Sequence, residues 1–361
     1  RAQFDRVFYQ WQTLVGELQQ LDRDCRTGSD ERRSRLKEQY AALVEDGKAL
    51  EKQLIDAATL ASVKEPEENA DLVDFLAGVA VMLANTEQYE DALRMAQLLL
   101  DHDLRCAQFQ AGLLHDLAGR AAFIVGQFDL AEKHLKKAQE IHALSGLGQQ
   151  YLQEIAYYQE EWLREENLRK AERMAGDLPR VLLRSSQGDI ELELFENEAP
   201  NTVANFITLI EQGFYDGLSF FRVLPQSMAQ AGCPEGDGSG GPGYVIECEC
   251  YRSDHRLHFR GSLGMLHRGP HTGGSQFYLT FLPMKNFDGN HTVFGRIVRG
   301  LEVLARLQRR DPPTPESLRI NPFPTMYVPS ADTIREAKVL RKRNHPYKPK
   351  IYPIAERKVS T

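Results

Sequence analysis

The fold of this chain is decided by FFRVLPQSMAQ at Phe220–Gln230 and by GSQFYLTFLPMKNFDGNHTVFG at Gly274–Gly295. The second stretch begins as an alternating apolar run typical of a β-strand, breaks at Pro283 and resumes at His291. Neither stretch holds a nucleophile beside a base, a close pair of carboxylates or a phosphate-binding loop before a helix. They offer instead a permanently charged guanidinium, two amides and an apolar wall, carried by Arg222, Gln230, Gln276, Met228, Phe277, Tyr278 and Phe287.

These residues carry a resemblance to the cyclophilins, a family of peptidyl-prolyl cis/trans isomerases. The matching motifs are FxRVxPxxMxQxG at Phe220–Gly232, GSQF at Gly274–Phe277 and DGNHTVFGRIVRGLEVL at Asp288–Leu304. Three motifs in this order are highly specific, whereas any one of them alone would be weak. The resemblance covers residues 179–344 and leaves residues 1–176 unexplained.

The resemblance implies an α + β chain of two domains, in which residues 179–344 form a closed antiparallel β-barrel with two covering helices. The residues agree with this interpretation. Alternation over 181–195 indicates a β-hairpin, and a helix is expected to begin at Pro200. A second helix is expected near 301–308, and residues 333–343 are predicted to be the strand that closes the barrel.

An X–Pro bond turns slowly because twisting it sacrifices amide resonance, at a barrier of about 18–20 kcal/mol. The twist localises a lone pair on the imide nitrogen, so a catalyst needs a fixed donor aimed at that atom and a dry pocket for the proline ring. Arg222 suits the donor role because its planar guanidinium stays charged. The resemblance gives Arg222 the same catalytic role and implies that Gln230 binds the carbonyl next to the proline. It also implies substrate contacts from Phe221, Met228, Leu266, His267, Gln276, Phe277, Tyr278, Phe287 and His291.

Several positions depart from the family's pattern. Ser227 stands where an aromatic residue is usual, which removes one wall of the proline pocket. Asn286 stands where eukaryotic members carry the tryptophan associated with cyclosporin contact. Tyr278 replaces the usual phenylalanine, His267 stands where an asparagine is common, and Arg268 beside it is long and charged.

We therefore predict a peptidyl-prolyl cis/trans isomerase that acts on proline-containing polypeptides and assists folding or conformational switching. The departures imply reduced activity and weak cyclosporin binding. The reaction forms no covalent intermediate, so no cofactor and no metal is expected. The alternative is a catalytically weak peptide-binding scaffold or chaperone with a cyclophilin-like barrel.

The first half of the chain is predicted to be helical. Residues 1–62 place apolar side chains at three- and four-residue steps, which predicts a coiled-coil-like hairpin that projects, caps or oligomerises. Residues 70–176 contain QYEDALRMAQ at Gln88–Gln97 and QFDLAEKHLKKAQ at Gln127–Gln139, each an aromatic turn followed by an alanine-centred helix. This pattern resembles tetratricopeptide repeats. It predicts a surface for a protein partner or client, and the alternative is a spacer or dimerisation unit.

The charge is unevenly distributed along the chain, whose net charge is −7. Residues 1–176 hold 21 Lys and Arg against 31 Asp and Glu, which argues against a nucleic-acid surface. Residues 334–361 hold 9 basic and 2 acidic residues, and we predict a basic C-terminal tail at 345–361. Its simplest interpretation is a solvated extension.

Neither the terminus nor the cysteines identify a compartment. The sequence starts with Arg1 rather than Met, and no apolar run approaches the roughly 20 residues that span a bilayer, so no membrane segment is expected. The 5 cysteines are too few and too scattered for a disulfide scaffold.

Two further motifs have simple structural interpretations. The glycine-dense loop Gly236–Gly243 precedes a strand rather than a helix, which argues against phosphate binding and favours a loop bordering the substrate groove. Cys248, Cys250, His255 and His258 are four possible ligands within 11 residues, but their spacing differs from that of zinc ribbons. Packing accounts for them equally well.

Overall fold

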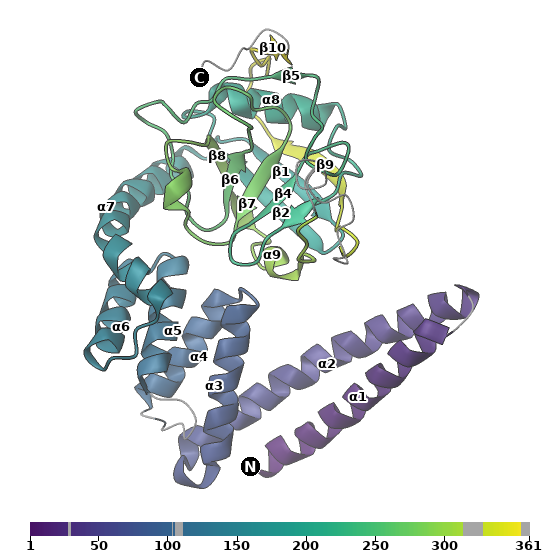
Figure 1. Cartoon of the computed structure of the whole chain (residues 1–361), viewed down its shortest axis with the longest axis vertical. Helices are drawn as coiled ribbons and strands as arrows, with labels where there is room; N and C mark the ends of the chain where they lie inside the picture. The colour runs from purple at the N-terminus through teal and green to yellow at the C-terminus, as the bar shows by residue number, and fades with distance from the viewer. Residues whose placement is uncertain (28–29, 103, 105–110, 313–327, 355–361) are drawn as a thin grey trace, which may run out of the picture. The chain divides into compact units, whose positions relative to one another are not determined.

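The structure, a computed structural model, describes residues 1–27, 30–102, 104, 111–312 and 328–354. Helices occupy the N-terminal part of the chain, and antiparallel strands occupy most of the C-terminal part (Figure 1). This arrangement confirms the predicted helical region followed by an antiparallel sheet. Among the described residues, no helix combines the length and the apolar character needed to cross a bilayer.

The chain divides into two compact units. The helical unit comprises Arg1–Asn85, Tyr89–Ala122 and Asp129–Gln153, and the sheet unit comprises Thr86–Gln88, Phe123–Phe128 and Glu154–Thr361. The division therefore falls within helix α7 (Gly146–Ala175), after Gln153. The predicted domain boundaries at 1–62, 70–176, 179–344 and 345–361 stay predictions.

The helical unit begins with a hairpin of α1 (Ala2–Thr27) and α2 (Asp30–Lys64). The three- and four-residue spacing brings Phe4, Val7 and Leu14 to one face of α1, where all three are buried. The 3-10 turn η1 (Glu67–Asn69) then leads into the next helices. Residues from α1, α2 and α3 (Ala70–Asn85) share one apolar core.

Small residues let the following helices approach closely. The helices are α4 (Tyr89–Asp101), α5 (Ala111–Ile124) and α6 (Phe128–Glu140). Ala92 and Ala96 are fully buried on α4, as are Ala131 and Ala138 on α6. A Cβ at Gly119 of α5 would lie 2.6 Å from the Leu135 side chain, so only glycine fits that approach. A tetratricopeptide-like array stays a prediction.

Eight strands of the sheet unit form one curled antiparallel sheet in the order β3-β4-β7-β6-β8-β2-β1-β9 (Figure 1). Their bounds are Arg180–Ser185 for β1, Gly188–Leu194 for β2, Arg222–Val223 for β3, Met228–Ala231 for β4, Ser262–Met265 for β6, Phe277–Thr280 for β7, Val293–Arg299 for β8 and Ile334–Arg341 for β9. Isolated bridges Ser219–Thr333 and Val223–Arg310 lie near the two ends of the sheet. A fully closed barrel stays a prediction.

Two helices cover this sheet at opposite ends, α8 (Pro200–Glu211) and the short α9 (Val303–Arg306) (Figure 1). Pro200 is the first residue of α8, where its missing N–H costs nothing. Phe206 of α8 packs on Phe277 of β7 and Phe294 of β8, with ring centroids 5.4 and 5.3 Å apart. These aromatic contacts place the apolar core between α8 and one face of the sheet.

Part of the predicted tail packs back on the sheet unit. Tyr352–Pro353 forms strand β10, which pairs with β5 (Tyr244–Val245). Tyr347 packs against the apolar core, and its hydroxyl donates to Glu196 Oε2 at 2.7 Å. Residues 345–354 are therefore folded rather than a free extension. Residues 355–361 of the predicted tail lie outside the described part.

Candidate functional site

One row of residues runs directly across four neighbouring strands. Arg222 of β3 is paired with Gln230 of β4, Gln230 is paired with Tyr278 of β7, and Tyr278 is paired with Gly264 of β6. Side chains that are directly opposite in an antiparallel sheet point to the same face. The fold therefore brings together two segments that are far apart in sequence, with the guanidinium, the amide and the phenol in line.

This row lies on the face of the sheet opposite the core. Val223, Ala229, Ala231 and Leu279 alternate with the row residues and belong to the apolar core. The same alternation places Phe277 in that core, where its ring contacts Phe206 and Tyr215. The prediction of Phe277 as a substrate contact is not supported, because it is fully buried on the wrong face of its strand.

Arg222 is partly exposed at the end of the row. Its side chain is 34% exposed, and Nε donates to Asp311 Oδ1 at 2.7 Å. The carboxylate fixes the plane of the guanidinium from one edge. Asp311 lies 89 residues from Arg222 in sequence, and no signal in the sequence links the two.

Gln230, Met228 and Phe221 are buried beside the arginine. The Nε2 group of Gln230 lies 3.3 Å from Met228 Sδ, so the thioether holds the amide in place. A Cβ at Gly238 would lie 3.2 Å from the Phe221 ring, which places Phe221 beneath the glycine-dense loop. All three residues are buried, whereas Arg222 is partly exposed.

Aromatic rings form a cluster around Tyr278. His291 stacks on Phe287 with ring centroids 4.8 Å apart and on His267 with centroids 4.1 Å apart. Tyr278 meets both Phe287 and His291 edge-on, at 5.8 and 5.9 Å. Phe287 lies in the turn η2 (Lys285–Phe287), so this turn and β7 together build the apolar wall.

Burial lowers the pKa of His291 to about 4 from its ordinary 6.5, and the nearby His267 adds to the effect. In the unfolded chain the imidazole takes up its proton near pH 6.5. Stability supplied by the neutral ring is therefore present above pH 6.5 and is lost as the pH falls toward 4.

As the pH falls from 6.5 toward 4, we expect the free energy of unfolding of His291→Gln to decrease less than that of the wild type, measured by urea unfolding. Parallel curves for the two proteins would contradict this expectation.

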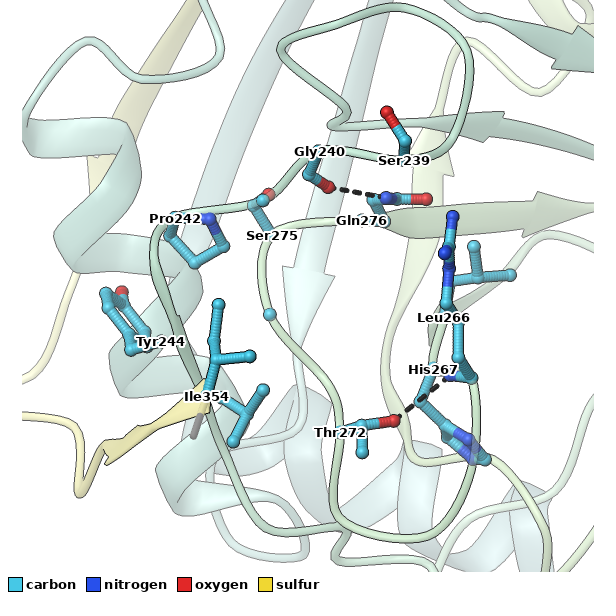
Figure 2. A pocket seen from close by; sticks show the side chains of 14 residues that line it. Ser239, Gly240, Pro242, Tyr244, Leu266, His267, Thr272, Ser275, Gln276 and Ile354 are labelled. Atoms are coloured by element: carbon cyan, nitrogen blue, oxygen red, sulfur yellow. Dashed lines mark hydrogen bonds between the residues drawn. The ribbon is translucent and has the colours of Figure 1, made fainter. Parts of the chain in front are cut away.

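A pocket of about 370 Å³ adjoins the predicted substrate residues (Figure 2). It is lined by Leu266, His267 and Gln276, which were predicted, and by Tyr244 and Ile354, which were not. Figure 2 shows Tyr244 and Ile354 on the side opposite Leu266 and His267. Ile354 directly follows β10, so the C-terminal segment contributes a wall that the family motifs do not predict.

The glycine-dense loop borders this pocket through Ser239–Pro242. Gln276 Nε2 donates to the carbonyl of Gly240 at 2.6 Å (Figure 2). It also donates to Gly238 O at 2.8 Å, and this carbonyl accepts a second hydrogen bond from Arg268 Nη2 at 2.6 Å. Gln276 and Arg268 therefore hold the loop over the pocket. Gly238 has φ = +84°, a conformation that a larger residue would strain.

The structure places the residues that depart from the family's pattern and those that were considered as metal ligands. Asn286 is exposed on η2, and Ser227 is partly buried directly before Met228. Of the metal candidates, His258 is fully buried and both of its ring nitrogens have partners at 2.7 Å. Cys233, Cys248 and Cys250 are free thiols, while the side chains of Cys25 and Cys106 lie outside the described part.

Comparison with known proteins places this geometry in a family. A family model described as cyclophilin type peptidyl-prolyl cis-trans isomerase/CLD matches residues 180–327. A Helicobacter pylori peptidyl-prolyl cis-trans isomerase is 48% identical over 131 residues, which are 36% of this chain and 80% of that protein. A Synechococcus elongatus isomerase is 46% identical over 136 residues, covering 37% and 92%. Isomerase B of Bacillus subtilis is 49% identical over 122 residues, covering 34% and 85%.

Proposed function

The chain belongs to the cyclophilin-type peptidyl-prolyl cis-trans isomerases, and on that premise we propose that Arg222 and Gln230 catalyse the isomerisation of X–Pro bonds in client proteins that are bound by the helical unit. Its homologues support isomerase activity on proline-containing peptides. The finer proposal concerns which residues act and what the helical unit adds.

The row Arg222–Gln230–Tyr278 is the observation that carries the assignment of the site. A peptide whose proline ring lies against Phe287 and Met228, with the buried Tyr278 ring supporting Phe287 from within, brings the preceding carbonyl to the Gln230 amide. Its imide nitrogen then faces the Arg222 guanidinium. Donation to that nitrogen stabilises the twisted amide more than the planar one, because only the twisted form localises the lone pair.

The same site explains how activity would be reduced but retained. Ser227 leaves one side of the proline pocket without an aromatic wall, so less apolar surface is buried on binding. Arg222, Gln230 and the cluster around Tyr278 do not depend on that wall. Weak cyclosporin binding, from the exposed Asn286, stays a prediction.

The helical unit supplies an exposed apolar patch of Leu113 and Ile141. Leu113 on α5 is 48% exposed, and Ile141 directly after α6 is 43% exposed. A Cβ at Gly112 would lie 3.1 Å from Ile141, so the start of α5 and the end of α6 meet at this patch. Adjacent exposed apolar side chains fit an apolar segment of an unfolded client.

Catalysed refolding of a protein limited by X–Pro isomerisation is the test of this docking role. The double variant Leu113→Glu, Ile141→Glu should bind such a client at least about tenfold more weakly. Full burial of each side chain contributes about 1.5–3 kcal/mol, and only the exposed half of each is available to a client. Its refolding catalysis should fall in proportion. The kcat/KM for a tetrapeptide, too short to reach the patch, should stay at the wild-type value.

The matched control is Tyr9→Glu, which changes an apolar residue of α1 that is 72% exposed and lies outside the patch. It should leave both activities unchanged. Equal refolding rates for the double variant and the wild type would leave the helical unit as a spacer or dimerisation unit.

A further inference from the structure

The outer face of β7 carries the hydroxyl of Tyr278, at the position where the family usually has phenylalanine. The Tyr278 ring crosses β6 at Gly264, where a Cβ would lie 2.2 Å from the ring carbon Cζ. The absence of a side chain at Gly264 therefore leaves the space in which the Tyr278 ring extends across β6. Its oxygen lies 2.7 Å from Nε2 of His258, and both residues are fully buried.

His258 is held from its other side by Asp288. The carboxylate oxygen Oδ1 lies 2.7 Å from His258 Nδ1 and accepts the backbone N–H of His258 at 2.8 Å. An ionised carboxylate only accepts hydrogen bonds, so Nδ1 carries a proton, and in the neutral imidazole Nε2 is then the acceptor. Burial raises the pKa of Tyr278, which keeps the phenol protonated as the donor. The hydrogen bonds therefore run from Tyr278 through His258 to Asp288.

Asp288 connects this network to the pocket wall and to α7. It follows η2 directly, so its side chain anchors the backbone next to Phe287. The Tyr157 hydroxyl of α7 lies 3.4 Å from Asp288 Oδ2, and the Lys285 ammonium lies 4.2 Å from the centre of the Tyr157 ring. Tyr157 belongs to the sheet unit, so α7 supports the turn that carries Phe287.

We propose that His258 and Asp288 are positioning residues of the isomerase site, which hold the Tyr278 ring and the η2 turn at the spacing that a proline ring requires. The inference rests on the isomerase activity of this domain. It assigns a role to His258, whose surroundings in the sequence suggested only a metal ligand or packing. It also explains why Tyr278 and Gly264 are directly paired: the added hydroxyl needs the space that the glycine leaves.

Two substitutions of one histidine separate its two hydrogen bonds. His258→Asn places an amide N–H near the position of Nδ1 and keeps the bond to Asp288, but it removes the acceptor of Tyr278. His258→Gln places an amide oxygen near the position of Nε2 and keeps the bond to Tyr278. The test is to measure kcat and KM on a Pro-containing tetrapeptide for each variant, in both the wild-type and the Tyr278→Phe backgrounds. Urea unfolding of the same proteins gives their stability.

His258→Asn should lower kcat/KM about threefold to tenfold through KM in the wild-type background, the range of one ordinary hydrogen bond. In the Tyr278→Phe background the same change should cost less than about twofold, because no hydroxyl remains to lose its partner. His258→Gln should lower kcat/KM less than His258→Asn does in the wild-type background, because it keeps the acceptor of Tyr278 and loses only the bond to Asp288. Tyr278→Phe removes a single oxygen and should itself raise KM by the same threefold to tenfold.

Equal losses from His258→Asn in the two backgrounds would overturn the inference, since His258 would then act only as a core residue. An unchanged KM for Tyr278→Phe would also overturn it, even if the His258 variants fail to fold. An inactive wild-type chain would count against the isomerase activity itself, so the two failures are distinguishable.

Discussion

Replacing Arg222 with alanine should lower kcat/KM for a Pro-containing tetrapeptide by about 10²–10³-fold, the usual cost of removing one fixed donor to a developing charge. The reaction has no covalent step, so stabilisation of the twisted amide is the whole of catalysis. The guanidinium is the permanently charged donor at the end of the row, and Asp311 holds its Nε edge. Its removal should affect kcat more than KM, because the donor is needed mainly in the twisted state.

Two further variants distinguish geometry from charge. Arg222→Lys keeps the positive charge but loses the planar fork, and it should recover only a small part of the activity. Asp311→Asn keeps an acceptor for Nε and should cost much less than the loss of Arg222. Unchanged circular dichroism would show that the sheet is intact. A wild-type rate equal to that of Arg222→Ala would instead favour the scaffold or chaperone interpretation.

The motifs predicted which residues belong to the site, but not which face of the sheet each side chain lies on. Strand alternation decides which of them lie on the face opposite the core. Phe277 and Tyr278 are adjacent in sequence and look equally suitable as wall residues. Because successive side chains of a strand point to opposite faces, one of the two must enter the core. Phe206 and Tyr215 are on the core side and hold Phe277 there. Counting along the strand from Gln276 would have identified this from sequence.

Other parts of the site depend on long-range contacts that no local pattern encodes. Asp311 reaches Arg222 from a loop after α9, and Ile354 reaches the pocket from a segment that sequence alone presents as a solvated basic tail. The tail prediction weighed only charge. The tyrosines within it, Tyr347 and Tyr352, are what attach it to the sheet unit, through the core and through β5.

The helical part shows the same limit. Apolar spacing predicted the helices of residues 1–62, and buried alanines mark where later helices touch. Helix α7 has an extended run of charged residues, and a run of this kind usually forms a solvent-exposed surface. In the structure, Glu165 and Glu172 of this run are buried in the sheet unit because two arginines from later in the chain neutralise them.

Arg256 is the centre of that buried charge network. Its guanidinium binds Glu165 through two parallel hydrogen bonds, from Nε at 3.0 Å and from Nη2 at 2.9 Å, and it also pairs with Glu172. Glu198 lies 3.6 Å away, and the Phe195 ring lies 3.8 Å below the guanidinium. Burial alone would lower the pKa of Arg256, but the ion pairs with Glu165 and Glu172 outweigh it and raise the pKa.

Arg256→Ala should therefore destabilise the sheet unit by up to about 3–5 kcal/mol, because the buried Glu165 and Glu172 each lose one of their arginine partners and keep only Arg169 and Arg296. Trp162 of α7 contacts Phe259 at 4.9 Å, and the chain has 2 tryptophans, so fluorescence-detected urea unfolding in a Trp11→Phe background reports this unit alone. The loss should shrink as the pH falls from 7 toward 5, because protonation neutralises the buried carboxylates that lost the Arg256 charge in the variant.

Arg184→Ala is the matched control for this prediction. It breaks the Arg184–Glu336 pair, whose side chains are 51% and 44% exposed, and an exposed pair contributes at most about 1 kcal/mol. If Arg256→Ala cost no more than this control, the carboxylates of α7 would be solvated rather than buried. Helix α7 would then be a linker instead of part of the sheet unit, and its support of the η2 turn would have no physical basis.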